Sequence, residues 1–489
     1  MANTVHPKQD QKVHTKLATR FKQFSEVATV HGVHKVANST SRSRMIAWSV
    51  LCLTLVGHAV YSISSSVKEY MSYPTLTYIK KETSNKMDFP SITICNANNY
   101  RLSALQSMSS NDTDIEQLLA SYLQTSLQTK NVLPLSRSDV AMKYSSALLN
   151  STTIKTLSSS IEWMKWNFKD WCKFSFSIKC ESPEDFTDYF YHSNTGVCQT
   201  FNYDGKYRQI APGAPFGLKL KLFTNEWDKV PQFSDGGAGI RIMIHPKDIY
   251  PNPFADSMLV PTGHLADIPI HKVITKRLKS PFKTNCTNGD GKFLIFPGNY
   301  TVGNCQYSCF FKKALEECGL IEPAYKFHKP REFQESLKRF QENNRSKADL
   351  SSCFHHLKID EDDCKCPPSC YEEKYRTKIS YLQWPTPANI PYYRSLMANF
   401  TGREKITDAD VHENIVFLKI YFDELSYDII AEQAVHLWPR FFGTVGGQLG
   451  LWMGASAFSI IEFFLFIADA VLEMCRGKVR NDDSSNTSA

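Results

Sequence analysis

Small residues recur through one apolar segment near the C-terminal end of the chain. The segment begins at residue 441 and reads FFGTVGGQLGLWMGASAFSIIEFFLF. Its glycines follow one another at intervals of three, one, three and four residues: Gly443, Gly446, Gly447, Gly450 and Gly454. A face of small residues lets helices approach closely, so one interpretation is a helix-dimerisation face in a plain membrane anchor.

The same segment also has the features of an ion pathway. Ala455 and Ser456 extend the small-residue run to mid-segment, where unwound backbone is tolerated only if it lines water or protein. Glu462 and Asp469 follow, and acidic groups inside a membrane segment usually face an aqueous path and attract cations. These features favour a pore. Because two helices per chain cannot enclose one, several subunits would share it around an axis.

The cysteines predict an oxidised domain. Of the 14 in the chain, 12 lie between residues 68 and 440, and Cys52 and Cys475 lie outside that range. An even number in a polar segment is typical of a disulfide framework in an oxidising compartment. A zinc site is the alternative for Cys364, Cys366 and Cys370 in CKCPPSC, but the paired CxxC spacing of such sites is absent. Spacing alone leaves the pairing open.

Catalytic motifs are missing from the sequence. Ser456 lies in GASAF, which is not GxSxG, and His412-Glu413 begins HENIV, which lacks the second histidine of HExxH. There is no P-loop and no GxGxxG. We therefore expect no enzyme, no cofactor and no metal site.

Two apolar segments must position these groups. Residues 45–67 contain no Asp, Glu, Lys or Arg, which is enough to cross a bilayer, and residues 441–472 form the second candidate span. A cleaved signal peptide is the rival interpretation of the first segment. It is disfavoured because 44 residues with eight Lys or Arg precede the segment, whereas a signal peptide has a short basic region there.

The flanking charges and the cysteines set the orientation. Arg476, Lys478 and Arg480 follow the second span, and the disulfide framework needs the outside of the cell. Both termini are therefore expected in the cytoplasm of a two-pass plasma-membrane protein. The expected division is a cytoplasmic tail 1–44, a span 45–67, an extracellular domain 68–440, a span 441–472 and a cytoplasmic tail 473–489. Six glycosylation sequons fall in the extracellular part: Asn111, Asn150, Asn285, Asn299, Asn344 and Asn399.

Composition excludes two other classes. A mean hydropathy of −0.33 is too low for a polytopic transporter. The net charge of +7 is too mild for nucleic-acid binding. Most of that charge, +6, lies in residues 1–44, so this tail is either solvated or in contact with anionic lipid.

Period-two patterns predict strands in the outer domain. Apolar residues alternate with charged or apolar ones at 218–222 and 240–244, and the run 415–422 is rich in β-formers. We interpret these as a central antiparallel sheet joined to the membrane helices. Helices are predicted at 112–129, 158–171, 304–318 and 331–343, and Cys305 and Cys309 would share one helical face. The fold class is therefore a membrane protein with an α+β, disulfide-rich extracellular domain.

Several motifs together resemble one family. Gly454-Ala455-Ser456 is similar to the G-A/S-S selectivity motif of the degenerin/epithelial sodium channel/acid-sensing ion channel family. His31-Gly32 resembles its gating motif before the first span. FPSITICN at 89–96, GVCQTFN at 196–202, CPPSC at 366–370 and WP at 384–385 follow in the family order. The resemblance covers nearly the whole chain.

The resemblance implies a fold and an activity. Family members are trimers of like or related subunits, blocked by amiloride-type compounds, that pass Na⁺ and have a palm sheet flanked by finger and thumb helices. Gly454, Ala455 and Ser456 would form the selectivity filter, with Glu462 attracting cations below it. Gating would involve His31, Gly32, Gly443 at the degenerin position, and Tyr73 facing Phe282, where acid-sensing channels have tryptophan.

The resemblance also implies a disulfide pattern. It uses all twelve outer cysteines in six bridges: Cys95–Cys198, Cys172–Cys180, Cys286–Cys370, Cys305–Cys366, Cys309–Cys364 and Cys318–Cys353. The last four would form a ladder along the thumb.

The activating ligand is the open point. Opening by an extracellular neuropeptide of the RFamide type is the preferred interpretation, because the finger stretch GLKLKLFTNEWDKV is as basic as it is acidic. Proton gating is the alternative, supported by Glu361, Asp362 and Asp363, and a non-conducting adhesion receptor is the remoter one. The ligand-binding residues are unknown. One candidate surface is aromatic and basic: Trp163, Trp166 and Trp171 with Lys165, Lys169 and Lys173.

Overall fold

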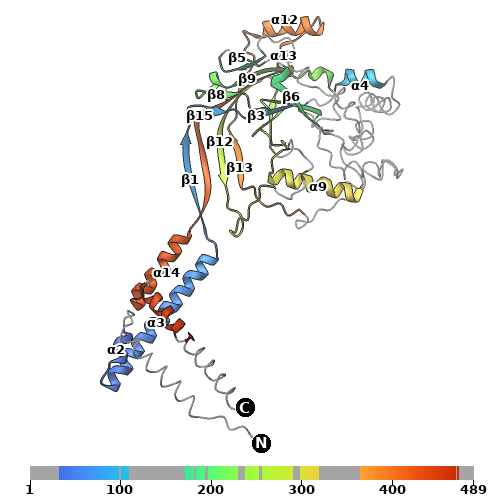
Figure 1. The fold of residues 1–489 in the computed structure, drawn as a ribbon. Coiled ribbons are helices and arrows are strands. Elements are labelled where there is room, and N and C mark those ends of the chain that lie inside the picture. The colour runs from blue at the N-terminus through green and yellow to red at the C-terminus, as the bar shows by residue number, and fades with distance from the viewer. Residues whose placement is uncertain are drawn as a thin grey trace, which may run out of the picture. The chain divides into compact units, whose positions relative to one another are not determined.

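The computed structural model describes residues 32–97, 101–109, 171–176, 178–180, 183–192, 196–229, 237–252, 256–289, 294, 298–318, 364–456, 458–469 and 471–472. These residues form two compact units, whose elements are labelled in Figure 1. The helical unit comprises the described parts of Met1–Leu76, Pro281–Lys283 and Gln433–Ala489. The sheet unit comprises those of Thr77–Ser280 and Thr284–Glu432.

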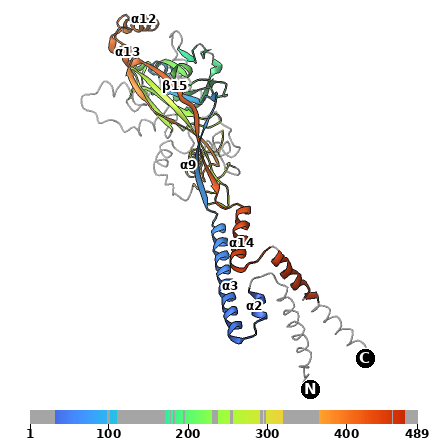
Figure 2. The same ribbon diagram turned by 90° about the vertical axis from the view of Figure 1, so that its left-hand side faces the viewer.

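The helical unit contains α2 (Val33–Ala37), α3 (Arg42–Met71), α14 (Trp438–Met453) and a further helix, Phe458–Asp469. Figure 2 shows α3 and α14 side by side. Among the described helices, α3 is long and apolar enough to cross a membrane, and the predicted span 45–67 lies within it. The predicted span 441–472 is not one straight helix. Its two helices diverge by 81°, and together they pass the same test if they form one broken span.

The larger sheet of the sheet unit has eight strands. Its order is β13-β12-β15-β9-β4-β5, with β1 paired to β15 and β14 paired to β12. The strands are β1 (Thr75–Thr83), β4 (Cys172–Phe174), β5 (Ile178–Lys179), β9 (Leu218–Phe223), β12 (His264–Lys276), β13 (Tyr371–Thr377), β14 (Ser380–Gln383) and β15 (Ile415–Ala434). β9 and β15 correspond to two of the predicted strands.

A second sheet has five strands in the order β11-β10-β3-β7-β6, and β2 pairs with β8 separately. These strands are β2 (Met87–Asp88), β3 (Ser91–Asn96), β6 (Phe186–His192), β7 (Gly196–Phe201), β8 (Arg208–Gln209), β10 (Gly239–His245) and β11 (Ser257–Pro261).

The expectation of one antiparallel sheet is therefore wrong in two respects. β10 lies in the second sheet, away from β9 and β15. In addition, β12 and β15 are parallel neighbours, paired from His264 with Val416 to Lys276 with Ala431. Parallel neighbours need a long connection, and local alternation carries no information about such a partner.

One apolar core is shared by the two sheets. In β9, Leu218, Leu220 and Leu222 are fully buried while the lysines between them are half-exposed, which confirms the period-two pattern. Ile240 and Ile242 of β10 belong to the same core cluster. Each such side chain contributes roughly 1.5–3 kcal/mol when buried, so alternation is enough to orient β9. In β10 the alternation is not kept, because Met243 is fully buried and Ile244 only partly.

Helices and short turns complete the sheet unit. They are α4 (Leu102–Ser109), α9 (Val302–Cys318), α12 (Ile390–Thr401), α13 (Asp408–Asn414) and the 3-10 turns η2 (Pro183–Asp185), η3 (Ala214–Phe216) and η4 (Glu226–Asp228). The predicted helix 304–318 is confirmed as α9. The helices predicted at 112–129 and 331–343 lie outside the described residues, and so does the helix predicted at 158–171 except for Trp171, which is not helical.

Candidate functional site

The three residues predicted to form a filter lie between two helices. α14 ends at Met453, and Gly454 follows with a left-handed φ of 58°. The Gly454 N–H donates to the Gly450 carbonyl at 3.0 Å. The Ala455 N–H donates to the Leu449 carbonyl at 3.3 Å. This pattern closes a helix with a left-handed residue, which glycine adopts without strain.

The next helix begins with two serines that cap each other. Ser456 Oγ accepts a hydrogen bond from the Ser459 N–H at 3.3 Å, and Ser459 Oγ accepts one from the Ser456 N–H at 3.1 Å. The arrangement has the logic of a capping box, in which each side chain satisfies the other residue's backbone. Sequence reasoning missed this cap, although the S-x-x-S spacing carries its signal. The break is therefore a built feature, with a stop on one side and a start on the other.

The two acidic residues of the segment lie on the second helix. Glu462 is half-buried and Asp469 is exposed in the single chain. They are seven residues apart, close to two helical turns, so both carboxylates lie on the same face. A row of carboxylates beyond the filter residues would attract cations if that face lined an aqueous path.

The glycines of α14 are open in the single chain. A Cβ added at Gly443, Gly446 or Gly447 meets no atom of the described chain within 4 Å. The face they form is therefore not used to pack α14 against α3. It remains available to other chains or to an aqueous path, so it fits both the dimerisation and the pore interpretations.

α14 packs on α3 through other side chains. Gln448 Nε2 donates to Ser66 Oγ at 3.0 Å. The rings of His58 and Trp452 meet edge to face with centroids 4.2 Å apart. Trp452 lies two residues before Gly454, so this contact fixes the helix end next to the break. Sequence analysis did not find it, because the partners come from opposite ends of the chain.

Gly32 is constrained in two ways. It precedes α2 with a φ of 92°, which disfavours any residue with a side chain. A Cβ there would lie 2.5 Å from Cys52 Sγ of α3, closer than atoms can approach. The glycine of the predicted His-Gly motif is thus required by the backbone and by the close contact, while His31 lies outside the described residues.

The structure brings together the two aromatic residues predicted to face each other. The ring centroids of Tyr73 and Phe282 are 5.7 Å apart, and the rings meet edge to face at 78°. Both residues belong to the helical unit, although more than 200 residues of sequence separate them. Edge-to-face pairs of this kind contribute roughly 0.5–1.5 kcal/mol beyond area burial.

Five of the six implied disulfides are present among the described residues: Cys95–Cys198, Cys172–Cys180, Cys286–Cys370, Cys305–Cys366 and Cys309–Cys364. Cys305 and Cys309 stand one turn apart on α9, as predicted. The sixth pair includes Cys353, which lies outside the described residues, as does Cys475. All three cysteines of CKCPPSC are bonded to other cysteines, so the zinc alternative is wrong for them.

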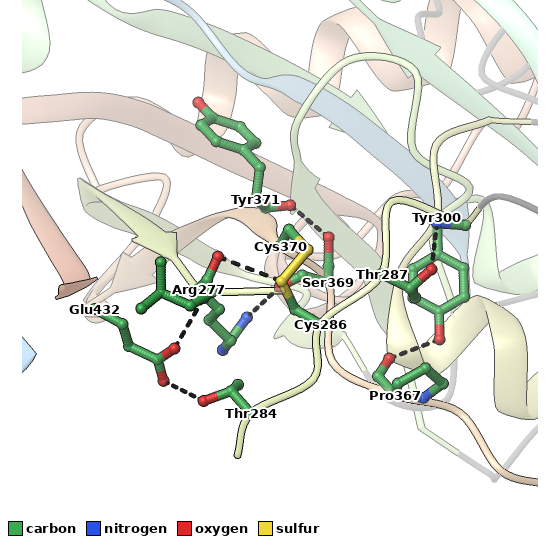
Figure 3. The surroundings of a disulfide bond; sticks show 12 residues. Arg277, Thr284, Cys286, Thr287, Tyr300, Pro367, Ser369, Cys370, Tyr371 and Glu432 are labelled. Carbon is green, nitrogen blue, oxygen red and sulfur yellow. Dashed lines mark hydrogen bonds between the residues drawn. A yellow bond between two sulfur atoms is a disulfide. The ribbon is translucent and has the colours of Figure 1, made fainter. Parts of the chain in front are cut away.

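Figure 3 shows the surroundings of the Cys286–Cys370 disulfide. The Cys370 N–H donates to the Thr287 carbonyl at 3.0 Å, and the Thr287 N–H donates to the Pro368 carbonyl at 2.9 Å. Tyr300 Oη donates to the Pro367 carbonyl at 2.7 Å. The bridge is thus embedded in a dense backbone network.

Three of the six predicted glycosylation residues fall in the described part of the chain. Asn285, Asn299 and Asn399 are all exposed. Asn111, Asn150 and Asn344 lie outside the described residues. Exposure is necessary for modification, and glycosylation of these three residues stays a prediction.

The two carboxylates of the predicted finger stretch, GLKLKLFTNEWDKV, lie next to hydrogen-bond donors. Glu226 Oε2 lies 3.1 Å from Lys229 Nζ, and both side chains are largely buried. Burial raises the pKa of Glu226, and Lys229 opposes this. Asp228 accepts from the Ser103 N–H and from Ser103 Oγ, both at 2.6 Å. Glu361, Asp362 and Asp363 lie outside the described residues.

Trp171 does not fit a ligand surface. It is buried and packs against Phe186 with ring centroids 5.3 Å apart. The tryptophan is a core residue, because it belongs to the same buried cluster as Cys172 and Phe174 of β4. Lys173 is half-exposed, and the other four candidates, Trp163, Trp166, Lys165 and Lys169, lie outside the described residues.

Comparison with known sequences places the chain among ion channels. The family "Amiloride-sensitive sodium channel" matches residues 24–466. The chain therefore belongs to the amiloride-sensitive sodium channel family. Members of this family are plasma-membrane ion channels, not enzymes, and they need no cofactor for the passage of Na⁺.

Individual relatives are distant. Degenerin del-1 of Caenorhabditis elegans is 28% identical over 288 residues, 58% of this chain and 41% of the relative. The epithelial sodium channel subunit beta of Neoceratodus forsteri is 28% identical over 312 residues, 59% and 44% of the two chains. The human bile acid-sensitive ion channel is 25% identical over 452 residues, 91% and 85%. The chain spans less than half the length of the degenerins it matches.

A solved proton-activated chloride channel aligns with 86% of this chain and 96% of its own. Its TM-score of 0.30 and 6% sequence identity are too low to bear on fold or function.

Proposed function

We propose that the chain forms a trimeric, sodium-selective cation channel of the plasma membrane, opened by an extracellular neuropeptide of the RFamide type. Each chain would cross the membrane twice, through α3 and through the α14 segment, with both termini in the cytoplasm. Three chains, identical or from related subunits, would share one pore around an axis. The sheet unit would be the extracellular ligand-sensing domain, with the layout of palm, finger and thumb.

The observation that carries this proposal is the capped break at Gly454, Ala455 and Ser456. A break inside an apolar segment is stable only where its backbone meets protein or water. Three copies around an axis would direct backbone carbonyls at passing ions, and site geometry and field strength would then select Na⁺. Glu462 would concentrate cations beyond the filter, and Gly443 would lie at the gate.

Two observations favour a peptide over protons as the ligand. Glu226 already faces Lys229, and Asp228 already accepts two hydrogen bonds from Ser103. Proton sensing by crowded carboxylates needs like charges that repel each other. Each of these carboxylates already has a partner of its own, so protonating it would relieve little electrostatic repulsion.

Proton gating stays the second candidate because burial raises the pKa of Glu226. In the helical unit, His436 Nε2 also lies 3.1 Å from Glu69 Oε1. Under this alternative, acid alone opens the channel and Glu226→Gln weakens the response.

Recording from cells that express only this chain tests the ligand. The probes are FMRFamide and related peptides, then acidic solution, then a bile acid, each with and without amiloride. We expect an amiloride-sensitive Na⁺ current with peptide. Current with acid alone would support the alternative. Absence of any current, with the chain at the surface and with related subunits co-expressed, would overturn the channel and favour an adhesion receptor.

Two variants test the pore residues. Ser456→Val should change the Na⁺/K⁺ permeability ratio, and Gly443→Cys treated with a thiol reagent should change open probability. Ser459→Ala removes the reciprocal cap without altering the filter sequence, so it tests whether the cap, as well as the Ser456 side chain, sets the permeability ratio. If neither current property moved in the first two variants, the pore assignment would be wrong.

A further inference from the structure

The chain passes between its two units at four points. The unit boundaries are Leu76/Thr77, Ser280/Pro281, Lys283/Thr284 and Glu432/Gln433. Glu432 is thus the last residue of the sheet unit before the chain continues toward α14. The segment 278–284 leaves the sheet unit and returns to it within a few residues.

Glu432 binds both ends of that segment. Its Oε2 accepts a hydrogen bond from the Leu278 N–H at 2.9 Å. Its Oε1 accepts one from Thr284 Oγ1 at 2.7 Å (Figure 3). All three residues belong to the sheet unit. The carboxylate therefore ties β15 to the start and to the end of one loop at once.

The residues on either side of the loop are held by further bonds. Arg277 donates through its backbone N–H to the Cys370 carbonyl and through Nη1 to the Ser369 carbonyl, both at 2.9 Å. Its Nη2 lies 2.7 Å from Glu372 Oε2. Cys286, two residues after Thr284, is held by the disulfide to Cys370. Between these fixed points, Glu432 joins residues at both ends of 278–284 to β15.

The middle of this loop carries an aromatic contact. Phe282 meets Tyr73, which follows α3, and both residues lie in the helical unit. We propose that Glu432 is a positioning residue for gating. It sets the course of residues 278–284 and thereby holds Phe282 where it transmits a change in the sheet unit to the segment after α3. This inference rests on the proposed channel function.

The chemistry of the pair of hydrogen bonds makes the role testable. A carboxylate accepts at both oxygens, whereas a glutamine has one accepting oxygen and an NH₂ that only donates. A glutamine could keep both contacts, because its NH₂ can donate to the Thr284 hydroxyl, whereas Glu432→Met keeps the length of the side chain and loses both bonds. Thr284→Val removes only the bond with Thr284 at constant shape, and Thr284→Ser keeps it.

Hydrogen exchange on the purified full-length chain tests whether Glu432 holds the loop. We expect Glu432→Met to speed exchange in peptides covering 278–284 by about tenfold, which corresponds to about 1.4 kcal/mol. Glu413→Met, at an exposed carboxylate of α13, is the matched control and should leave those peptides unchanged. Uniformly faster exchange across the sheet unit would indicate general destabilisation and would overturn the local role.

Currents test the coupling. With FMRFamide, or acidic solution if only acid opens the channel, we expect Glu432→Met and Thr284→Val each to raise the half-activating concentration about fivefold. The double variant should be no worse than Glu432→Met alone, because that variant already lacks the bond with Thr284. Thr284→Ser should resemble the parent, and the Na⁺/K⁺ permeability ratio should stay constant. Unchanged activation with faster loop exchange would overturn the gating role. A parent chain that never conducts would instead overturn the proposed function. The hydrogen-exchange measurement would still show whether Glu432 holds residues 278–284.

Discussion

His245, at the end of β10, shows how a buried residue makes this fold sensitive to acid. Its Nδ1 lies 2.8 Å from the Pro246 carbonyl, which can only accept, so Nδ1 carries the proton. Nε2 then accepts from Thr93 Oγ1 at 2.8 Å, and Thr200 Oγ1 lies 2.7 Å from Thr93 Oγ1. Burial lowers the pKa of His245 to about 4. The neutral ring is thus the form that the fold accepts.

The sign of the pH dependence follows from that pKa. In the unfolded chain histidine titrates near 6.5, so the contribution of His245 is fully present above about pH 6.5 and is lost as pH falls toward about 4. We expect the free energy of unfolding to fall by about 3 kcal/mol across this window. Thermal unfolding of the purified chain at several pH values measures it. His245→Asn does not titrate and should flatten this part of the profile; an equal slope in that variant would contradict the assignment.

Gly32 carries a second prediction at the residue scale. Gly32→Ala puts a Cβ at a left-handed φ, which costs about 1–2 kcal/mol, and presses it against Cys52 Sγ. We expect a loss of current per channel at the surface. Cys52→Ala added to Gly32→Ala should restore part of the current, because it removes the clash and leaves the backbone strain. No improvement in the double variant would argue against the contact.

At the scale of elements, the pairing of α3 with α14 depends on few side chains. His58 and Trp452 meet at 4.2 Å beside the break, and Gln448 donates to Ser66. We expect His58→Ala and Trp452→Leu each to alter the Na⁺/K⁺ permeability ratio, because the end of α14 would shift relative to α3. His58→Phe keeps an aromatic ring that can meet Trp452 edge to face, so it should leave the permeability ratio as in the parent. Additive effects of His58→Ala and Trp452→Leu would contradict a direct contact.

The elements also show what the sequence could predict. The alternating leucines of β9 and the four-residue spacing of Cys305 and Cys309 carry their own periodicity, and the structure agrees with both. The sheet to which β10 belongs and the parallel pairing of β12 with β15 depend on partners far along the chain. The pattern of neighbouring residues contains no information about such partners.

The same division holds for the candidate site. The small-residue run marked the position of the break, because such residues suit an unwound segment. The contacts of Glu432 with Thr284 and of His58 with Trp452 join residues more than a hundred positions apart. No spacing rule connects these residues, so only the folded chain reveals them.

At the scale of the whole molecule, the open glycine face of α14 has a different role in each of two possible assemblies. A Cβ at Gly443, Gly446 or Gly447 meets nothing within 4 Å in the described chain. In a plain anchor this face would pack against one second copy, and the molecule would be a dimer. In a pore it would lie near an axis shared by three copies, with the filter break of each chain at the same level.

Counting chains decides between the two. We expect the purified complex, measured by mass photometry in detergent, to contain three chains, since two apolar segments per chain cannot enclose an ion path alone. Gly446→Leu should then reduce current while leaving the count at three, because the added side chain narrows a path that a shared axis forms. Two chains in the parent, and separation into single chains in Gly446→Leu, would instead establish the face as a dimer contact and remove the structural basis for a shared pore.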